Sequence, residues 1–161
     1  MITVITGMDP FQFDRVVQAI DELAGAGKIG EEVFIQLGAG NYVPRHCTHE
    51  KFLSFAGISE KIRQSSVVIT HAGAGSTLNC IHNGKHPVMI PRLAKFGEVV
   101  DDHQVPFAER LDRFGYATLV LDMKDLHAAI EKARGKTQTA DRSVVNGLVS
   151  HLQGFWGSLH G

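Results

Sequence analysis

Residues 67–84 read VVITHAGAGSTLNCIHNG, and the rest of the chain is best interpreted outward from this stretch. Its first four residues are rich in β-branched types and predict a buried strand. A loop of small residues follows, and from Ser76 the apolar residues Leu78 and Ile81 have a helical spacing that ends at Asn83. The stretch therefore predicts a strand, a tight glycine turn and the start of a helix.

Such a turn suits an anionic ligand. Glycines let the backbone approach a ligand closely, and the first free N–H groups and the dipole of a helix attract negative charge. The hydroxyls of Ser76 and Thr77 are able to cap the helix or to donate to phosphate oxygens. Glycine-rich turns also follow strands in α/β domains as plain scaffold, so this stretch alone leaves both interpretations open.

Strands and helices alternate along the rest of the chain. Short apolar runs predict strands, and apolar residues at helical spacing predict helices. The expected strands cover residues 1–6, 33–37, 52–55, 67–70, 86–90 and 117–121, and the expected helices begin at Phe13, Ser59, Ser76, Asp102 and Lys124. This alternation favours an α/β fold with a Rossmann-like, doubly wound, mostly parallel sheet.

Three loops are expected to meet at one edge of that sheet. They cover residues 6–10, 71–77 and 91–104, and each follows a predicted strand. Ligands of doubly wound sheets bind outside the carboxyl ends of the strands. The segment after residue 90 is also long for such a unit, and long loops at strand ends are often functional. This convergence predicts a functional site more strongly than any single motif.

Size and composition exclude several classes of protein. A chain of 161 residues corresponds to a single domain, 1–161, and 43% hydrophobic and 20% charged residues are typical of a globular protein. Sixteen basic against seventeen acidic residues leave no charge excess for binding nucleic acid. No apolar run approaches a membrane span and no signal peptide is visible. His46, Cys47 and His49 lack a fourth ligand, so no metal site is expected.

The nucleotide-binding motifs with the strongest signals are absent. The first strand ends in TGMDP rather than in G-x-G-x-x-G, and the central loop has Leu78 in place of a third glycine. Neither a P-loop nor a G-x-S-x-G nucleophile elbow occurs. A nucleotide-sugar site fits better, because the helix at Ser76 would neutralise a diphosphate. Asp102, His103 and Gln104 at the facing helix start are suited to hydrogen-bond sugar hydroxyls.

Four segments resemble the donor-binding C-terminal half of glycosyltransferase family 28, and within it the small subunits of two-part enzymes. They are ITVITGMDPFQFDRVVQAID, VFIQLGAGNYVP, VVITHAGAGSTL and GKHPVMIPRLAKFGEVVDDHQVPFAERL, in the same order up to about residue 121. The resemblance implies a Rossmann-like half of a GT-B enzyme that is inverting, metal-independent and without a cofactor, and that uses a UDP-sugar. Pro91-Arg92 followed by Glu98 resembles the bacterial exopolysaccharide subgroup more than the eukaryotic one.

The resemblance also implies roles for individual residues. Thr6, Gly7, Gly73, Ala74, Gly75, Ser76 and Thr77 would bind the donor diphosphate, and Asp102, His103 and Gln104 would bind the donor sugar. Asn79 would contact the ribose where many family members have a glutamate, so a carboxylate charge is missing there. His71 is a candidate catalytic base, and a loop histidine satisfied by a backbone carbonyl is the favoured alternative.

A two-part enzyme divides the chemistry between two chains. This chain would bind the UDP-sugar and stabilise the departing UDP, and a membrane-anchored subunit would bind a polyprenyl-linked saccharide acceptor. It would then be cytoplasmic and recruited to the membrane by its partner. Residues 134–142 are predicted to be a linker and 143–160 an amphipathic helix, which packs on its own domain or docks the partner. A non-catalytic, nucleotide-binding regulatory subunit and a structural partner that binds nothing are the alternatives.

Overall fold

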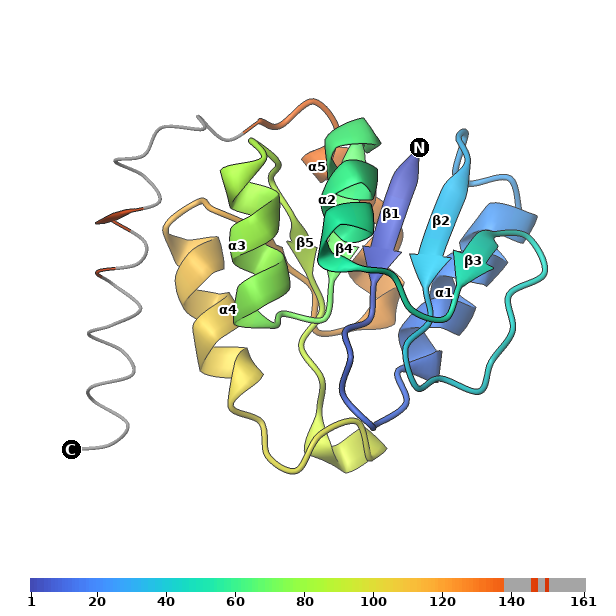
Figure 1. Ribbon diagram of the computed structural model, residues 1–161, viewed down its shortest axis with the longest axis horizontal. Coiled ribbons are helices and arrows are strands. Elements are labelled where there is room, and N and C mark those ends of the chain that lie inside the picture. Colours follow the sequence, from blue (N-terminus) through green and yellow to red (C-terminus); the bar gives the residue numbers. More distant parts are fainter. Residues whose placement is uncertain (138–145, 148–149, 151–161) are drawn as a thin grey trace.

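The computed structural model describes residues 1–137, 146–147 and 150, and Figure 1 shows their arrangement. The described residues form a six-stranded sheet in the order β3-β2-β1-β4-β5-β6, in which every neighbouring pair is parallel. The strands are β1 (Ile2–Ile5), β2 (Val33–Gln36), β3 (Thr48–Glu50), β4 (Val67–Thr70), β5 (Val88–Met89) and β6 (Thr118–Leu119). The predicted doubly wound parallel sheet is thereby confirmed.

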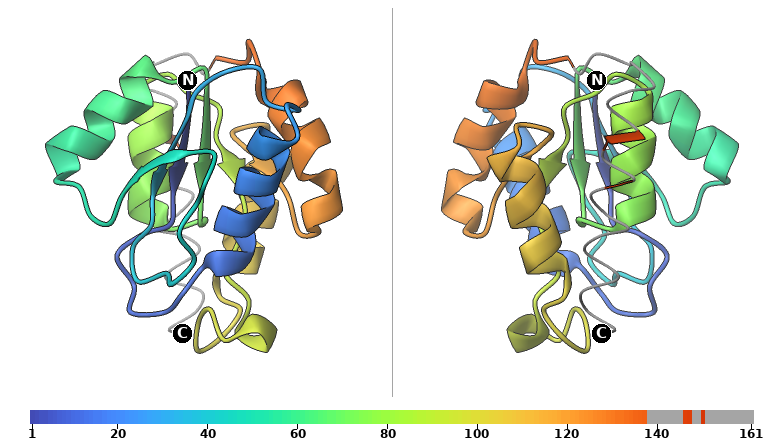
Figure 2. Two further views of the ribbon diagram at one scale, coloured as in Figure 1. Left: turned by 90° about the vertical axis from the view of Figure 1, so that its right-hand side faces the viewer. Right: turned by 90° about the vertical axis from the view of Figure 1, so that its left-hand side faces the viewer.

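Helices cover both faces of the sheet. They are α1 (Asp14–Gly25), α2 (Phe55–Gln64), α3 (Ala74–His82), α4 (Gln104–Arg113) and α5 (Leu126–Ala133), with short 3-10 segments η1 (Ala94–Phe96) and η2 (Met123–Asp125). The helices α1 and α5 lie on one face and α2 and α3 on the other (Figure 2). Within the described part of the chain, no helix has both the length and the apolar character to cross a membrane.

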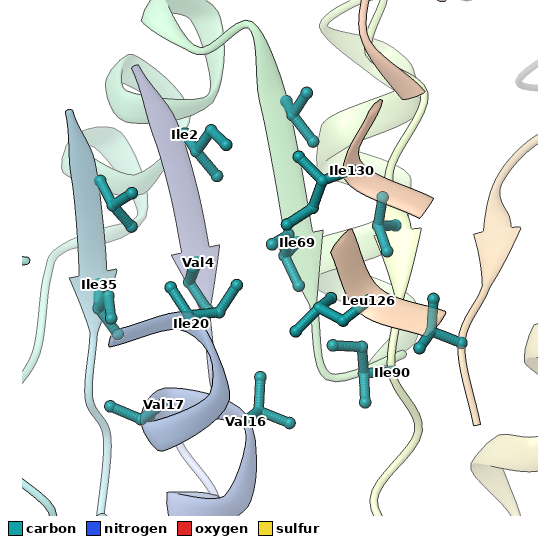
Figure 3. Close-up of a cluster of buried hydrophobic side chains, with 14 of the residues drawn as sticks. Ile2, Val4, Val16, Val17, Ile20, Ile35, Ile69, Ile90, Leu126 and Ile130 are labelled. Atoms are coloured by element: carbon teal, nitrogen blue, oxygen red, sulfur yellow. The ribbon is translucent and has the colours of Figure 1, made fainter. Parts of the chain in front are cut away.

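The main core lies between the sheet and the α1–α5 layer. Alternate residues of a strand face opposite sides, so Ile2 and Val4 of β1 point into this core while Ile5 points to the α2–α3 side. Ile20 of α1 and Ile130 of α5 are fully buried against the strands (Figure 3). Because β1, β2 and β4 are buried along their whole lengths, they are apolar runs without a polar face.

The strand predicted over residues 52–55 is wrong. Thr48–Glu50 forms the edge strand instead, pairing with Phe34–Gln36 of β2, and all three of its residues are exposed. Phe55 begins α2, because the Ser54 side chain caps the helix by accepting a hydrogen bond from the Gly57 N–H. The three apolar residues of this segment, Phe52, Leu53 and Phe55, fit a strand pattern, but the serine cap starts a helix four residues earlier than predicted.

Other boundaries differ by a few residues. The helix predicted from Ser76 begins at Ala74, the one predicted from Asp102 begins at Gln104, and the loop after β5 contains η1. Of the predicted linker, 134–142, only the first four residues are described. The predicted amphipathic helix, 143–160, lies almost entirely outside the described residues.

The winding of the sheet reverses between β1 and β4. From β1 the chain proceeds to β2 and β3 on one side, and it then crosses to β4, β5 and β6 on the other. In doubly wound sheets a crevice forms outside the carboxyl ends of the strands at such a point. The two segments that leave the sheet here begin at Thr6 and His71.

Candidate functional site

A pocket of about 340 Å³ opens where the winding reverses. Its walls come from the loop after β1, the loop after β4, the first two turns of α3 and the start of α2. Among its lining residues are six of the predicted site residues, namely Gly7, His71, Gly73, Gly75, Ser76 and Asn79. The structure therefore brings Gly7 of the loop after β1 together with the loop after β4 and α3, as predicted, whereas the third predicted loop, 91–104, supplies no residue to the lining.

The start of α3 faces this pocket without a protein cap. Gly73 is the N-cap residue and supplies no side chain, and the first hydrogen bond of the helix runs from the Thr77 N–H to the Gly73 carbonyl. The N–H groups of Ala74, Gly75 and Ser76 therefore have no partner within the helix. Gly75 is exposed, and a Cβ at this position would meet no atom within 4 Å. These N–H groups and the helix dipole form an accessible site for an anion.

The imidazole of His71 packs between the two glycine loops. A Cβ on Gly73 would lie 2.3 Å from His71 Nε2, and a Cβ on Gly7 would lie 2.7 Å from the same ring. Both positions therefore need glycine, and at Gly7 the positive φ of 91° adds a second reason. The imidazole ring therefore sets the separation between the loop after β1 and the loop after β4.

His71 is neutral at physiological pH. Burial, followed by the positive charge of Arg92, lowers the pKa of His71 to about 4. The ring Nδ1 lies 3.4 Å from the Ile5 carbonyl oxygen, which assigns the proton to Nδ1 and leaves Nε2 as an acceptor. This contact is the one expected of a loop histidine satisfied by a backbone carbonyl. The catalytic role of His71 stays a prediction.

Asn79 joins α3 to α2 at the edge of the pocket. Its Nδ2 donates to Ser59 Oγ at 3.0 Å, and its Oδ1 accepts from Asn83 Nδ2 at 2.9 Å. The amide orientation follows from these two bonds. Of the two N–H groups on Nδ2, the bonds of the described residues use one, so the second is available to a ligand. The predicted contact of Asn79 with a ribose is untested.

One wall of the pocket is apolar, and the sequence did not point to it. Phe55 and Ile58 come from the start of α2 and Leu53 from just before it, and Met8 of the loop after β1 also lines the pocket. Phe55 and Met8 are 74% and 75% exposed, so large apolar surfaces lie at the mouth of the pocket. A capped helix start at Ser54, had it been recognised in the sequence, would have placed Phe55 and Ile58 on the same face as the site.

Arg92 holds the loop after β1 in place through hydrogen bonds to its backbone. It is 1% exposed, and its Nη1 donates to the carbonyl oxygens of Phe11 and Gln12 while its Nη2 donates to that of Thr6 at 2.6 Å. Its guanidinium stacks on the Phe13 ring, 4.7 Å from the centroid. The conformation of the loop that carries Gly7 thus depends on a residue of the loop after β5.

A second buried pair supports the same region. Both nitrogens of the Arg15 fork contact the Glu98 carboxylate, at 2.8 and 2.9 Å, and Glu98 is fully buried. The Leu93 N–H also donates to this carboxylate. These bonds attach the loop after β5 to α1, and Gln12 adds a bond to the Phe96 carbonyl.

The remaining predicted residues lie outside the lining of the pocket. Thr6 and Thr77 are fully buried; the Thr6 hydroxyl donates to the Gln36 carbonyl, whereas Thr77 Oγ1 has no partner among the described residues. Asp102 accepts from the Ala94 N–H, and Gln104 accepts from the Arg92 N–H. His103 contacts Asp101 on the surface. The segment between β5 and α4, which carries Asp102 and His103, lies beyond the carboxyl end of the sheet in Figure 1, and the role of residues 102–104 in binding the sugar stays a prediction.

Comparison with known proteins gives a consistent family. A sequence profile described as Glycosyltransferase family 28 C-terminal domain matches residues 1–146. Two similar proteins are named UDP-N-acetylglucosamine transferase subunit ALG13. The one from Yarrowia lipolytica is 25% identical over 126 residues, 70% of this chain and 61% of its own length. The human one is 30% identical over 132 residues, 76% of this chain and 11% of its own length. This chain thus spans less than two thirds of these curated relatives.

Solved structures agree with this result at the level of the fold. The glycotransferase of kitacinnamycin superposes with a TM-score of 0.61 and 17% identity, over 93% of this chain and 38% of that one. CalG4, the calicheamicin glycosyltransferase, superposes with a TM-score of 0.61 and 14% identity, over 91% of this chain and 36% of that one. The predicted fold class, one half of a GT-B glycosyltransferase, is confirmed.

Proposed function

Because this chain belongs to glycosyltransferase family 28, whose C-terminal domain its residues 1–146 match, we propose that it binds the donor of a UDP-sugar glycosyltransferase. The transferase is inverting and metal-independent, and it acts on a polyprenyl-linked saccharide in exopolysaccharide synthesis. A membrane-anchored partner supplies the acceptor site, and this chain works on the cytoplasmic face of the membrane with that partner.

The uncapped start of α3 carries this proposal. Three N–H groups, at Ala74, Gly75 and Ser76, point out of the helix beside an open pocket, where the helix dipole is equivalent to about half a positive charge. A diphosphate is the group that such an arrangement binds best, because it accepts several hydrogen bonds and carries negative charge on both phosphates. The donor diphosphate therefore lies over Gly75.

The rest of the pocket suits a uridine. The apolar wall formed by Leu53, Phe55 and Ile58 offers a surface on which a pyrimidine ring can pack. The free N–H of Asn79 donates to a ribose hydroxyl oxygen. The glutamate that many family members have at this position would instead accept a hydrogen bond from the ribose hydroxyl. With these contacts the uridine extends from the helix start along α2, and the sugar points toward the loops after β1 and β5.

The reaction follows from this placement. The acceptor hydroxyl attacks the anomeric carbon from the side opposite UDP, the bond between that carbon and the diphosphate oxygen breaks, and its electron pair leaves with UDP. The α3 N–H groups stabilise the negative charge that develops on the diphosphate. The proton of the acceptor passes to a base. A histidine with a pKa of about 4, as at His71, is a weak base at neutral pH, so we assign the base to the partner.

Two features support a partner. Met8 and Phe55 at the pocket mouth are about three quarters exposed, and a second half would cover them. The similar proteins from Yarrowia lipolytica and human are themselves named subunits.

Calorimetric titration tests the proposal directly. The chain is titrated with UDP, UDP-glucose, UDP-glucuronate and UDP-N-acetylglucosamine, with and without a chelator, and with ADP as the control. We expect UDP and one UDP-sugar to bind, ADP to bind weakly or not at all, and the chelator to change nothing. Absence of binding to all four uridine ligands would overturn the donor-binding function. Strong sugar transfer by the isolated chain would overturn the division of labour with a partner.

The alternative is a non-catalytic regulatory subunit that binds a nucleotide. The Asn79 amide, which stands in place of a charged ribose contact, is the observation that favours it. Reconstitution with the partner separates the two: an enzyme subunit loses transfer activity when its donor pocket is blocked, whereas a regulatory subunit binds UDP but leaves the transfer step to another site.

A further inference from the structure

Arg92 is a fully buried cation whose position is unusual. Four of its hydrogen bonds go to backbone carbonyl oxygens, which carry no net charge to balance the guanidinium. Its Nε is buried and has no hydrogen-bond partner among the described residues. Buried charges in proteins are normally paired, because leaving the solvent costs several kcal/mol that only a counter-charge and hydrogen bonds offset.

The carboxylates nearby leave much of this charge unbalanced. Glu98 bonds to Arg92 only through its backbone oxygen, and its carboxylate is engaged by both nitrogens of the Arg15 fork. Asp9 Oδ2 lies 3.7 Å from Arg92 Nε, but its side chain is 48% exposed and makes no hydrogen bond to the guanidinium. A half-exposed carboxylate at this distance is screened by water and balances a buried cation only in part.

The positive charge lies close to the pocket. The same Asp9 oxygen is 3.9 Å from His71 Nε2, so a single carboxylate spans the distance between the Arg92 guanidinium and the imidazole that lines the pocket. The lowered pKa of His71, to which the Arg92 charge contributes after burial, agrees with this proximity. Arg92 also bonds to the Thr6 carbonyl, which immediately precedes Gly7 in the pocket wall.

We propose that Arg92 is a positioning residue for the donor diphosphate and acts on it through the loop after β1, without touching it. Asp9 partly balances the Arg92 charge, and the bound diphosphate replaces Asp9 in this role. This inference rests on the proposed donor-binding function. Arg92 touches no ligand: it fixes the backbone around Gly7 and directs an incompletely balanced positive charge at the place where the two phosphates bind. The N–H groups at the start of α3 and the charge of Arg92 then both attract the diphosphate.

The test compares the binding of UDP with that of uridine, which has the same base and ribose but no phosphate. Arg92→Gln removes the charge, and at an effective dielectric constant of about 20 we expect it to weaken UDP binding about tenfold while uridine binding stays within about twofold. Arg92→Lys keeps the charge with fewer hydrogen bonds, and we expect it to restore most of the UDP affinity. Asp9→Asn removes the competing carboxylate and should strengthen UDP binding by about threefold.

Arg134→Gln is the matched control. Arg134 pairs with Glu31 and Glu131 near the amino ends of the strands, away from the pocket, so its loss changes the net charge equally but should leave UDP affinity unchanged. Equal losses of UDP and uridine binding in Arg92→Gln would mean a purely structural role and overturn the inference, as would unchanged UDP affinity. If Arg92→Gln does not fold, Asp9→Asn decides, because it alters an exposed side chain: no gain in UDP affinity overturns the inference. Wild-type protein that binds neither ligand would instead overturn the proposed function.

Discussion

Replacing Gly75 with glutamate separates ligand binding from folding at the start of α3. Gly75 is the second residue of the helix, it is exposed, and no atom lies within 4 Å of a Cβ built on it. The Cβ of a substituted residue therefore meets no neighbour. The glutamate carboxylate occupies the place that the donor diphosphate is proposed to take, beside the three unpartnered N–H groups.

The substitution should stabilise the fold. Glutamate is a better helix former than glycine by about 0.6 kcal/mol, and a negative charge in the first turn adds about 0.5 kcal/mol through the helix dipole. Together they amount to about 1 kcal/mol, which for a domain of this size corresponds to a rise in melting temperature of about 3 °C.

The same carboxylate should abolish donor binding. A negative charge about 5 Å from the diphosphate costs about 3 kcal/mol at an effective dielectric constant of about 20, which is a loss of more than about 100-fold in affinity. Thermal unfolding and calorimetric titration with UDP measure the two effects on the same sample. Gly30→Glu is the control, because Gly30 is also exposed with open space around it but lies before β2, at the amino end of the sheet.

A Gly75→Glu protein that keeps the wild-type affinity for UDP would refute the reasoning, because the diphosphate would then not bind at the helix start. A protein that loses both UDP binding and thermal stability would refute the claim that this helix start is open. Gly30→Glu should keep UDP affinity within about twofold of the wild-type value, since a charge there acts only through the screened long-range field.

Three further predictions concern stability. The pKa of His71 is about 4 in the folded protein against an ordinary value of 6.5, so the unfolded chain binds the proton more readily. The free energy of unfolding therefore has its full value above pH 6.5. It decreases as the pH falls from 6.5 toward 4. Urea unfolding at pH 7 and pH 5 should therefore show a drop about 2 kcal/mol larger in the wild-type protein than in His71→Gln, and equal drops would contradict the assigned pKa. Asp21→Asn should lower the free energy of unfolding by about 2 kcal/mol, because the buried carboxylate accepts hydrogen bonds from two backbone N–H groups and a tyrosine hydroxyl, and an amide cannot accept all three. Urea unfolding measures this loss. UDP affinity is the control and should not change. Ser54→Ala removes the side chain that accepts from the Gly57 N–H, and it should lower the free energy of unfolding by about 1 kcal/mol in the same assay. Ser54→Asp should keep the wild-type free energy of unfolding.

Much of the fold was predictable because the strands of a parallel sheet are buried on both faces. The apolar runs that became β1 and β4 have no competing interpretation once each is seen to be followed by a helix. The family prediction, made from four segments in order, is confirmed by the match over residues 1–146. The prediction over residues 52–55 is wrong because the three apolar residues there fit either a strand or a capped helix, and local pattern alone does not decide between them.

The sequence by itself determined where an anion could bind, because a glycine turn that leads into a helix creates free N–H groups through local backbone geometry alone. It also determined two of the loops that meet there, those after β1 and β4, since the order of strands and helices dictates which strand ends share an edge. The apolar wall at Leu53 and Phe55 and the buried cation at Arg92 were decided only by the tertiary structure. Arg92 bonds to a carbonyl 86 positions earlier in the chain, and no local pattern encodes a contact whose partners come together only when the sheet closes around them.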